Sequence, residues 1–212
     1  MLSLRKNEIM KPTGIITVTL LSTILITSCH WHTPHTVIGS GSVETMEVMV
    51  ADFTGVSVTG TCDVEIEIGE SRSVELSAQS QILDVMTYEV RSGILHIGFR
   101  PEYNINTSKD ISAQIVIPEL DFVAITGAGS FEISGEEQDF LDIYITGTGD
   151  VNALDMEVDE CNIRIEGAGD CEVNVTESLD VQISGVGNVT YRGQPVLTYD
   201  ISGVGNVTAI SK

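Results

Sequence analysis

This sequence has few basic residues: 10 Lys and Arg stand against 31 Asp and Glu, which gives a formal net charge of −21. No stretch gathers the Lys and Arg side chains that would neutralise the phosphates of a nucleic acid. Nucleic-acid binding is therefore excluded. The acidity indicates a self-repelling surface rather than one particular partner.

The sequence also lacks the groups of residues that support catalysis. Beyond the N-terminal region its one histidine is His96, which lies between Leu95 and Ile97 in an expected strand. No Ser/His/Asp set, metal-ligand cluster or phosphate-binding loop is visible. We therefore expect no enzyme, no cofactor and no metal. The alternative that stays open is a polysaccharide-binding or polysaccharide-degrading protein, since paired carboxylates serve glycoside hydrolysis.

The N-terminus has the pattern of an export signal. Basic Arg5, Lys6 and Lys11 precede an uncharged run over residues 12–26, as in a secretory signal peptide. The run is too short for a bilayer-spanning helix, which needs about 20 apolar residues. It ends in Ile-Thr-Ser-Cys, which resembles a lipoprotein cleavage site. We predict a signal peptide over residues 1–28, with translation starting at Met1 or Met10, and lipidation of Cys29.

The residues after Cys29 are predicted to form a lipidated tether over 29–43. Several acyl chains make membrane attachment stable where a single chain does not. Three His residues within 30–35 could bind a metal, but a solvated linker accounts for them equally well. Without residues 1–28 the chain has 7 basic and 30 acidic residues, a net charge of −23. We expect a cell-envelope protein anchored by lipid, with the outer membrane favoured and its face left open.

Five segments of the chain superimpose without gaps: residues 123–131, 143–151, 163–171, 181–189 and 199–207. They recur every 18 or 20 residues, and a sixth, degenerate copy at 56–64 has Cys62 in place of the second glycine. Periods of this size indicate stacked structural units. The turn glycines of all six copies are Gly60, Gly127, Gly129, Gly147, Gly149, Gly167, Gly169, Gly185, Gly187, Gly203 and Gly205.

Within each copy, apolar residues alternate with polar or small ones, which is typical of strands with one buried face. Three inward columns are expected. They are Ile125, Ile145, Ile165, Ile183 and Ile201; then Val123, Ile143, Ile163, Val181 and Tyr199; and then Phe131, Val151, Cys171, Val189 and Val207. The Gly-x-Gly turns are expected to need positive φ.

A short polar residue follows the second glycine of each copy, and we expect these side chains to bond to the turn backbone. They are Ser130, Asp150, Asp170, Asn188 and Asn206. Calcium binding by these turns is a weaker alternative. The sequence thus predicts an all-β domain over residues 44–212, a β-solenoid with 18–20-residue coils, with a propeller or a sandwich as weaker alternatives because neither suits so short a period. Residues 101–110 are its best candidate for an excursion loop.

The pattern over residues 52–66, the strands at 83–97 and 115–120 and the Gly-x-Gly turns resemble the DUF2807 family, the "putative auto-transporter adhesin, head GIN domain". The resemblance covers about residues 44–211. It implies a single right-handed parallel β-helix in secreted or lipid-anchored bacterial proteins, often from Bacteroidetes. It brings no catalytic residues.

Three cysteines follow Cys29: Cys62, Cys161 and Cys171. Cys161 and Cys171 occupy positions that other copies fill with Leu, Phe or Val, so we expect buried small apolar side chains. A 161–171 disulfide remains an alternative, because exported proteins can keep disulfides.

The functional interpretation is a lipid-anchored protein that displays a rigid β-helix for adhesion or protein–protein contact. Its expected partners are the membrane, through the lipid, and an unknown protein or glycan ligand. Homo-oligomerisation through the ends of the stack is also expected, because exposed strand edges invite pairing.

Overall fold

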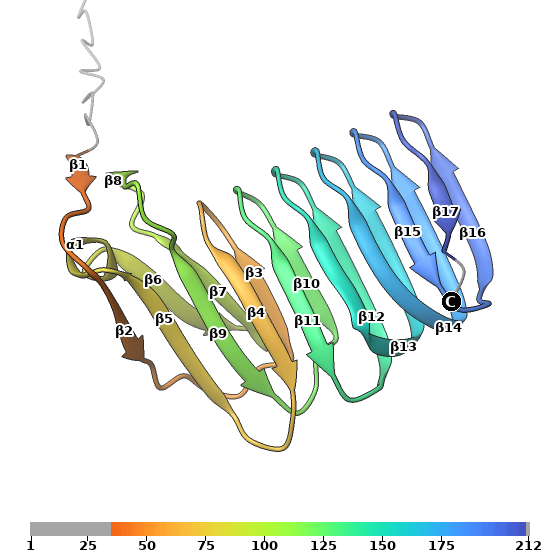
Figure 1. The fold of residues 1–212 in the computed structure, drawn as a ribbon, viewed down its shortest axis with the longest axis horizontal. Coiled ribbons are helices and arrows are strands. Elements are labelled where there is room, and N and C mark those ends of the chain that lie inside the picture. The colour runs from red at the N-terminus through yellow and green to blue at the C-terminus, as the bar shows by residue number, and fades with distance from the viewer. Residues whose placement is uncertain (1–34, 211–212) are drawn as a thin grey trace, which may run out of the picture. The chain divides into compact units, whose positions relative to one another are not determined.

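The computed structural model describes residues 35–210, which form an all-β body with one short helix (Figure 1). The elements, in chain order, are β1 (His35–Ile38), β2 (Val43–Glu47), β3 (Gly55–Val58), β4 (Asp63–Ile68), β5 (Ser73–Gln79), α1 (Ser80–Leu83), β6 (Met86–Arg91), β7 (Ile94–Phe99), β8 (Tyr103–Asn106), β9 (Ser112–Ile117), β10 (Phe122–Ile125), β11 (Phe131–Gly135), β12 (Gln138–Ile145), β13 (Val151–Ile165), β14 (Cys171–Ile183), β15 (Val189–Arg192), β16 (Val196–Ile201) and β17 (Val207–Ala209).

Two series of parallel strand pairs make up most of the 15-stranded main sheet. One series runs through β7, β3, β10 and β12 to the second halves of β13 and β14 and then β16. The other runs through β9, β4 and β11 to the first halves of β13 and β14 and then β15 and β17. Because β13 and β14 belong to both series, the sheet curls and its two arms enclose one core.

The strand register places the first predicted column in line, with Ile125 beside Ile145, then Ile165, Ile183 and Ile201. The first four are at most 1% exposed, so the inward orientation predicted for them is confirmed. The prediction was wrong for Tyr199 of the second column, which is 59% exposed. This tyrosine lies on β16, the outermost described strand of its series, where no further strand covers it.

The prediction of a single right-handed parallel β-helix, or β-solenoid, is wrong. All-β is correct, but the main sheet is mixed: β2 pairs antiparallel with β5, β5 with β9, and β6 with β7. Figure 1 shows these strands beside the N-terminal end of the two parallel series.

A two-residue hairpin explains one of the antiparallel pairs. Ser92 and Gly93, between β6 and β7, have φ values of 53° and 80°. Two consecutive positive φ values characterise the tight turn whose twist suits an antiparallel hairpin. The chain therefore reverses at this point instead of continuing around a coil, and Met86 comes to lie opposite Phe99.

The stacked turns explain the Gly-x-Gly sequence differently from our expectation. Among these glycines only Gly60 and Gly129 have positive φ, at 101° and 149°. The others are needed because a Cβ atom at each would collide with backbone of the preceding turn: at Gly149, for example, it would meet the carbonyl oxygen of Gly129. Close approach of neighbouring backbones, rather than an unusual dihedral angle, therefore requires glycine here.

Backbone hydrogen bonds and isolated bridges connect the middle residues of successive turns. We call this series the turn ladder; its members are Thr61, Ala128, Thr148, Ala168, Val186 and Val204. Each turn from Ala128 onward donates its middle N–H to the first glycine carbonyl of the turn before it, as Thr148 does to Gly127 at 2.8 Å. The ladder therefore has two ends, at Thr61 and at Val204.

Residues 101–110 leave the main sheet, as predicted. Their strand β8 pairs in parallel with β1 to form a separate two-stranded sheet. Four residues of the predicted tether, 35–38, thus form a strand. The predicted signal peptide, Cys29 and residues 29–34 lie outside the described residues. No helix within residues 35–210 is long and apolar enough to cross a bilayer.

We expect Gly149→Ala to lower the free energy of unfolding by about 2–3 kcal/mol, since the added methyl group must displace stacked backbone. Urea denaturation measures the change. Gly69→Ala is the control, because a Cβ there would lie 3.6 Å from Val116 Cγ1, an ordinary contact. Equal destabilisation by the two variants would contradict the close-approach explanation.

Candidate functional site

Polar side chains after the second glycines bond to the next turn in the stack. The Asp170 carboxylate accepts hydrogen bonds from Asn188 N at 2.7 Å and Asn188 Nδ2 at 3.0 Å. Asp150 accepts one from Asp170 N at 2.7 Å, and Asn188 Oδ1 accepts one from Asn206 N at 3.2 Å. These residues join neighbouring turns, as capping side chains do.

Calcium binding gains no support from this arrangement. Residues 35–210 contain no group of three or more His, Cys, Asp or Glu side chains placed to hold a metal ion. The carboxylates of the turns are instead engaged as acceptors for backbone N–H groups.

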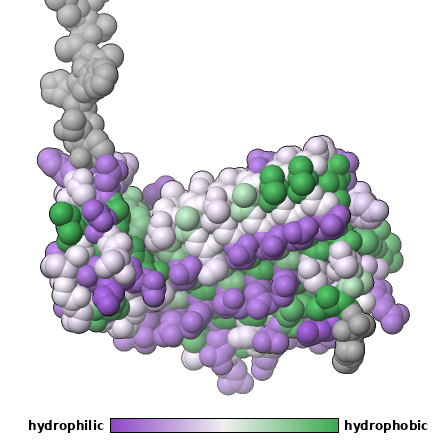
Figure 2. Space-filling model, turned by 45° about the horizontal axis from the view of Figure 1, so that its top comes forward, coloured by the Kyte–Doolittle hydropathy of each residue, from purple (hydrophilic) through white to green (hydrophobic). Residues whose placement is uncertain are grey.

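Amide side chains, rather than cations, accompany several outward carboxylates. Gln114 donates to Glu65 at 3.1 Å, and Asn152 donates to Glu132 at 2.9 Å. Asn162 likewise donates to Asp142 at 2.9 Å. Figure 2 shows that hydrophilic side chains form rows across the stacked units on the face that it presents. Neutral donors let acidic side chains occupy neighbouring strands, where directly opposed like charges would destabilise the sheet.

All three cysteines of the described chain are free and buried, so the 161–171 disulfide is not formed. Cys161 and Cys171 are at most 1% exposed, as expected for apolar positions. Loss of hydration, with a contribution from Asp63, raises the pKa of the Cys62 thiol to about 12. Burial likewise raises the pKa of the Cys161 and Cys171 thiols well above their usual range. Protonated, buried thiols are poor nucleophiles.

His96 lies between two residues that sequence reasoning did not connect with it. In the strand register it is opposite Ser57 on β3 and Glu89 on β6. A serine, a histidine and a carboxylate in a row resemble a hydrolytic triad, but no hydrogen bond joins these three. Glu89 instead accepts from Arg91 at 2.7 Å, which lowers the Glu89 pKa. Without an activated nucleophile, the row supports no reaction.

A shallow concavity of about 530 Å³ lies over β12, β13 and β14, where its lining includes Asp142, Tyr144 and Arg164. The Arg164 guanidinium carbon is 5.8 Å from the centre of the Tyr144 ring. Interaction with the Glu166 carboxylate raises the pKa of the Tyr144 hydroxyl. The strands beneath are paired on both edges, so only side chains are offered to a ligand there.

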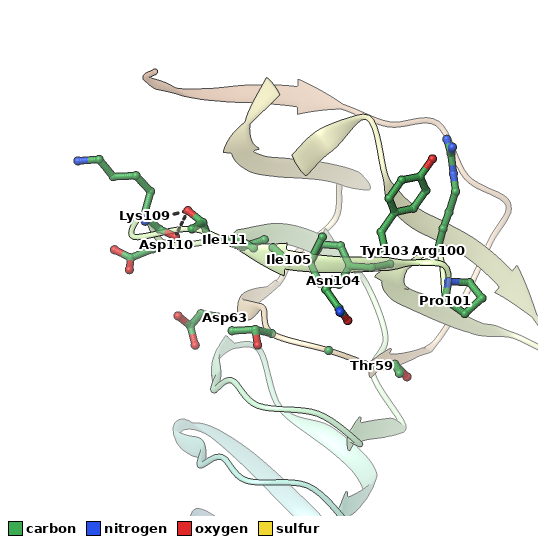
Figure 3. A pocket seen from close by; sticks show the side chains of 14 residues that line it. Thr59, Asp63, Arg100, Pro101, Tyr103, Asn104, Ile105, Lys109, Asp110 and Ile111 are labelled. Carbon is green, nitrogen blue, oxygen red and sulfur yellow. Dashed lines mark hydrogen bonds between the residues drawn. The ribbon is translucent and has the colours of Figure 1, made fainter. Parts of the chain in front are cut away.

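A cleft of about 500 Å³ lies where the turn ladder meets the excursion of residues 101–110. One wall is the backbone of residues 59–63, and the other is β8 (Figure 3). Phe99 and Ile111, the residues at which the chain leaves and rejoins the main sheet, also line it. Asn104 of β8 also lines the cleft, and Arg100 and Lys109 lie at its opposite ends (Figure 3).

Both walls of this cleft carry backbone groups without partners. Beside β1, the Glu102 carbonyl accepts a hydrogen bond from His35 N and the Asn106 carbonyl accepts one from Gly39 N. The backbone N–H and carbonyl groups of the even-numbered residues of β8 therefore point toward β1. Backbone groups alternate in direction along a parallel strand. The Ile105 N–H and the Tyr103 and Ile105 carbonyls therefore face away from β1, and no hydrogen bond among the described residues uses them.

The opposite wall has the same property at Thr61. Gly60 O and Cys62 N bond to Ala128, at 2.6 Å and 3.1 Å. The Thr61 N–H and carbonyl consequently point the other way, toward the cleft, and have no hydrogen-bond partner within residues 35–210. From Ala128 onward, the corresponding side of each turn is covered by the turn that comes before it in the chain.

Sequence reasoning missed this cleft, although Cys62 signals it. Every later turn needs glycine at this position because a Cβ atom there would collide with the backbone of the preceding turn. Cys62 follows no such turn, since residues 100–111 have moved out to form β8. A side chain is therefore accommodated, and it is 2% exposed.

The fold and cleft define an all-β protein with an open, backbone-lined groove beside a stack of glycine turns. The family model of DUF2807, described as "Putative auto-transporter adhesin, head GIN domain", matches residues 52–146 and 123–195. The chain belongs to this family, which confirms the resemblance drawn from sequence. The description indicates adhesion or binding at the cell envelope or surface.

Three solved structures of bacterial proteins are similar to this chain. A "putative adhesin" of Bacteroides fragilis NCTC 9343 has a TM-score of 0.51 at 16% identity, covering 82% of this chain and 100% of that chain. A "putative lipid binding protein" of Parabacteroides distasonis ATCC 8503 has a TM-score of 0.43 at 19% identity, covering 83% and 100%. A "putative cell adhesion protein" of Clostridium sporogenes ATCC 15579 has a TM-score of 0.39 at 13% identity, covering 80% and 100%.

The Bacteroides fragilis structure supports the fold assignment and nothing further. No protein with a curated description matches this chain in sequence.

We expect Asp170→Ala to lower the free energy of unfolding by about 1 kcal/mol, because Asn188 N then loses its acceptor. Asp170→Asn should retain most of this stability, since Asn188 already makes the equivalent bond to Asn206. Glu172→Ala, at an exposed position on β14, is the control. Thermal and urea denaturation both report the differences. A destabilisation by Asp170→Asn as large as that by Asp170→Ala would contradict the bonding role.

The three described thiols should resist alkylation by iodoacetamide at pH 8 in the folded protein and react fully in urea. Burial and raised pKa values both withhold the reactive thiolate. Mass spectrometry of the peptides containing Cys62, Cys161 and Cys171 gives the extent of labelling. Rapid native labelling of Cys171 would show that its strand opens locally.

Proposed function

We propose that this chain is a lipid-anchored cell-envelope protein that presents its all-β body for adhesion or protein–protein contact. Membership of a family described as an adhesin head carries the proposal. The lipoprotein-like sequence ending at Cys29 supports anchoring, and the outer membrane is the proposed site. The signal peptide 1–28, the tether 29–43 and the domain 44–212 remain its predicted parts.

The surface of the described body fits a binding role better than a chemical one. The thiols are buried and protonated, and Ser57, His96 and Glu89 are not bonded into a relay. The proposal therefore includes no catalysis. The polar groups of the turns bond to one another and stiffen the body, which suits a surface that must keep its shape while bound.

Self-association belongs to this proposal as a further use of the surface. Large apolar side chains are exposed at the C-terminal end of the stack, where Figure 2 shows hydrophobic surface. Val186 and Val204 lie on the last two turns and are 57% and 68% exposed, whereas Val196 and Tyr199 lie on β16 and are 75% and 59% exposed. Exposed apolar patches commonly mark contacts between proteins.

We expect Cys29→Ala to abolish palmitate labelling and to move the protein from the detergent phase to the aqueous phase. The reason is that loss of the acyl chains removes the anchoring free energy. Cys62→Ala, which changes a buried thiol, should retain labelling and partitioning. If Cys29→Ala is still labelled and still enters detergent, the lipid anchor is refuted.

Adhesion is measured separately with cells that produce the wild-type chain or Cys29→Ala. Wild-type cells should adhere to at least one of a panel of immobilised extracellular proteins and glycans, and the variant cells should not. Equal adhesion of the cells that produce the wild-type chain and of those that produce Cys29→Ala would overturn the binding role while leaving the lipid anchor intact.

A further inference from the structure

The cleft between Thr61 and β8 resembles a β-sheet from which one strand is absent, because each of its two walls is an unpaired backbone edge. Thr61 is the first member of the turn ladder and is bridged to Ala128 on one side only. β8 is paired with β1 on one side only. Figure 3 shows β8 and residues 59–63 running alongside each other on the two sides of the cleft.

We propose that the cleft binds an extended polypeptide segment of another protein, which lies as a strand between β8 and Thr61. This inference rests on the proposed adhesive function and names the partner class for it. A bound strand would accept from the Ile105 N–H and donate to the Tyr103 and Ile105 carbonyls. Its other edge would bond to the Thr61 N–H and carbonyl.

The size of the cleft fits such a segment. With a strand spacing of about 4.8 Å, a sheet thickness of about 10 Å and a rise of about 3.3 Å, one strand residue occupies roughly 160 Å³. The cleft of about 500 Å³ thus holds about three residues. This length matches the backbone groups on offer, since β8 itself has four residues.

The chemistry of the walls favours a peptide over a glycan or an ion. The unused groups are main-chain donors and acceptors, which pair with another main chain by strand addition. Side chains of both charges surround the opening, with Arg100 and Lys109 against Asp63 and Asp110. Asp63 is already bonded to Ser130 N and Oγ, both at 2.9 Å. Phe99 and Ile111 add apolar surface, which favours a segment with an aliphatic side chain facing inward.

The test selects peptides from a random heptapeptide library displayed on phage, using the full-length chain in detergent as bait. Synthetic versions of the selected peptides are then measured by fluorescence polarisation against matched variants. Ile105→Pro removes the N–H that faces the cleft, whereas Ile105→Ala shortens the same side chain and retains that N–H. Because no described hydrogen bond uses this N–H, the proline variant should remain folded.

We expect selected peptides to bind the wild type and Ile105→Ala within about threefold of each other. Binding should fall at least tenfold in Ile105→Pro. Peptides N-methylated at alternate residues, which lose the donors of one edge, should weaken to a similar extent. Asn104→Trp places a large side chain in the cleft and gives a second blocked variant if thermal denaturation shows that Ile105→Pro is unfolded.

Three results would overturn the proposal. In the first, no selected peptide depends on the cleft. In the second, peptides bind equally to the blocked variants or bind equally well after N-methylation. In the third, a glycan panel binds at the cleft and the peptides do not. None of these outcomes changes the palmitate labelling of Cys29, so failure here is distinct from failure of the proposed anchoring.

Discussion

Direct contact between the backbones of successive turns is the constraint on which this structure depends. A Cβ atom at Gly147 or Gly149 would collide with a carbonyl of the turn before it. Glycine therefore allows the spacing at which each middle N–H reaches the preceding turn. Once the turns are fixed in this way, the strands on either side are held in register. Isoleucine then follows isoleucine along the core, and outward acids lie beside outward amides.

At its Thr61 end, the turn ladder stops beside the excursion that contains β8. Where the chain departs at Arg100 and returns at Ile111, the ladder loses the turn that would have preceded Thr61. The departing residues do not leave open solvent behind, because β8 pairs with β1 and returns to face the gap. A cleft bounded by two unpaired backbone edges is the consequence, and Cys62 beside it is free to carry a side chain.

The sequence predicted the parts of the fold that follow from a local period. Alternation in residues 123–189 gave the inward columns, and the polar residue after each second glycine pointed to bonding within the turns. It did not predict the antiparallel strands, since the hairpin depends on two dihedral angles at Ser92 and Gly93 that an isolated Ser-Gly pair signals weakly. The cleft was also missed. It arises from tertiary pairing between β1 and β8, which are 68 residues apart in register.

The last two turns share the octapeptide Ile-Ser-Gly-Val-Gly-Asn-Val-Thr, at residues 183–190 and 201–208. Each of these turns has the same two acceptors for the N–H groups of the next turn: the carbonyl of its first glycine and the side-chain oxygen of its asparagine. A duplicated segment of 18 residues could therefore be inserted in the gene without redesign of any neighbour. Evolution can lengthen this end of the protein by whole units while the cleft, at the opposite end of the ladder, keeps its geometry.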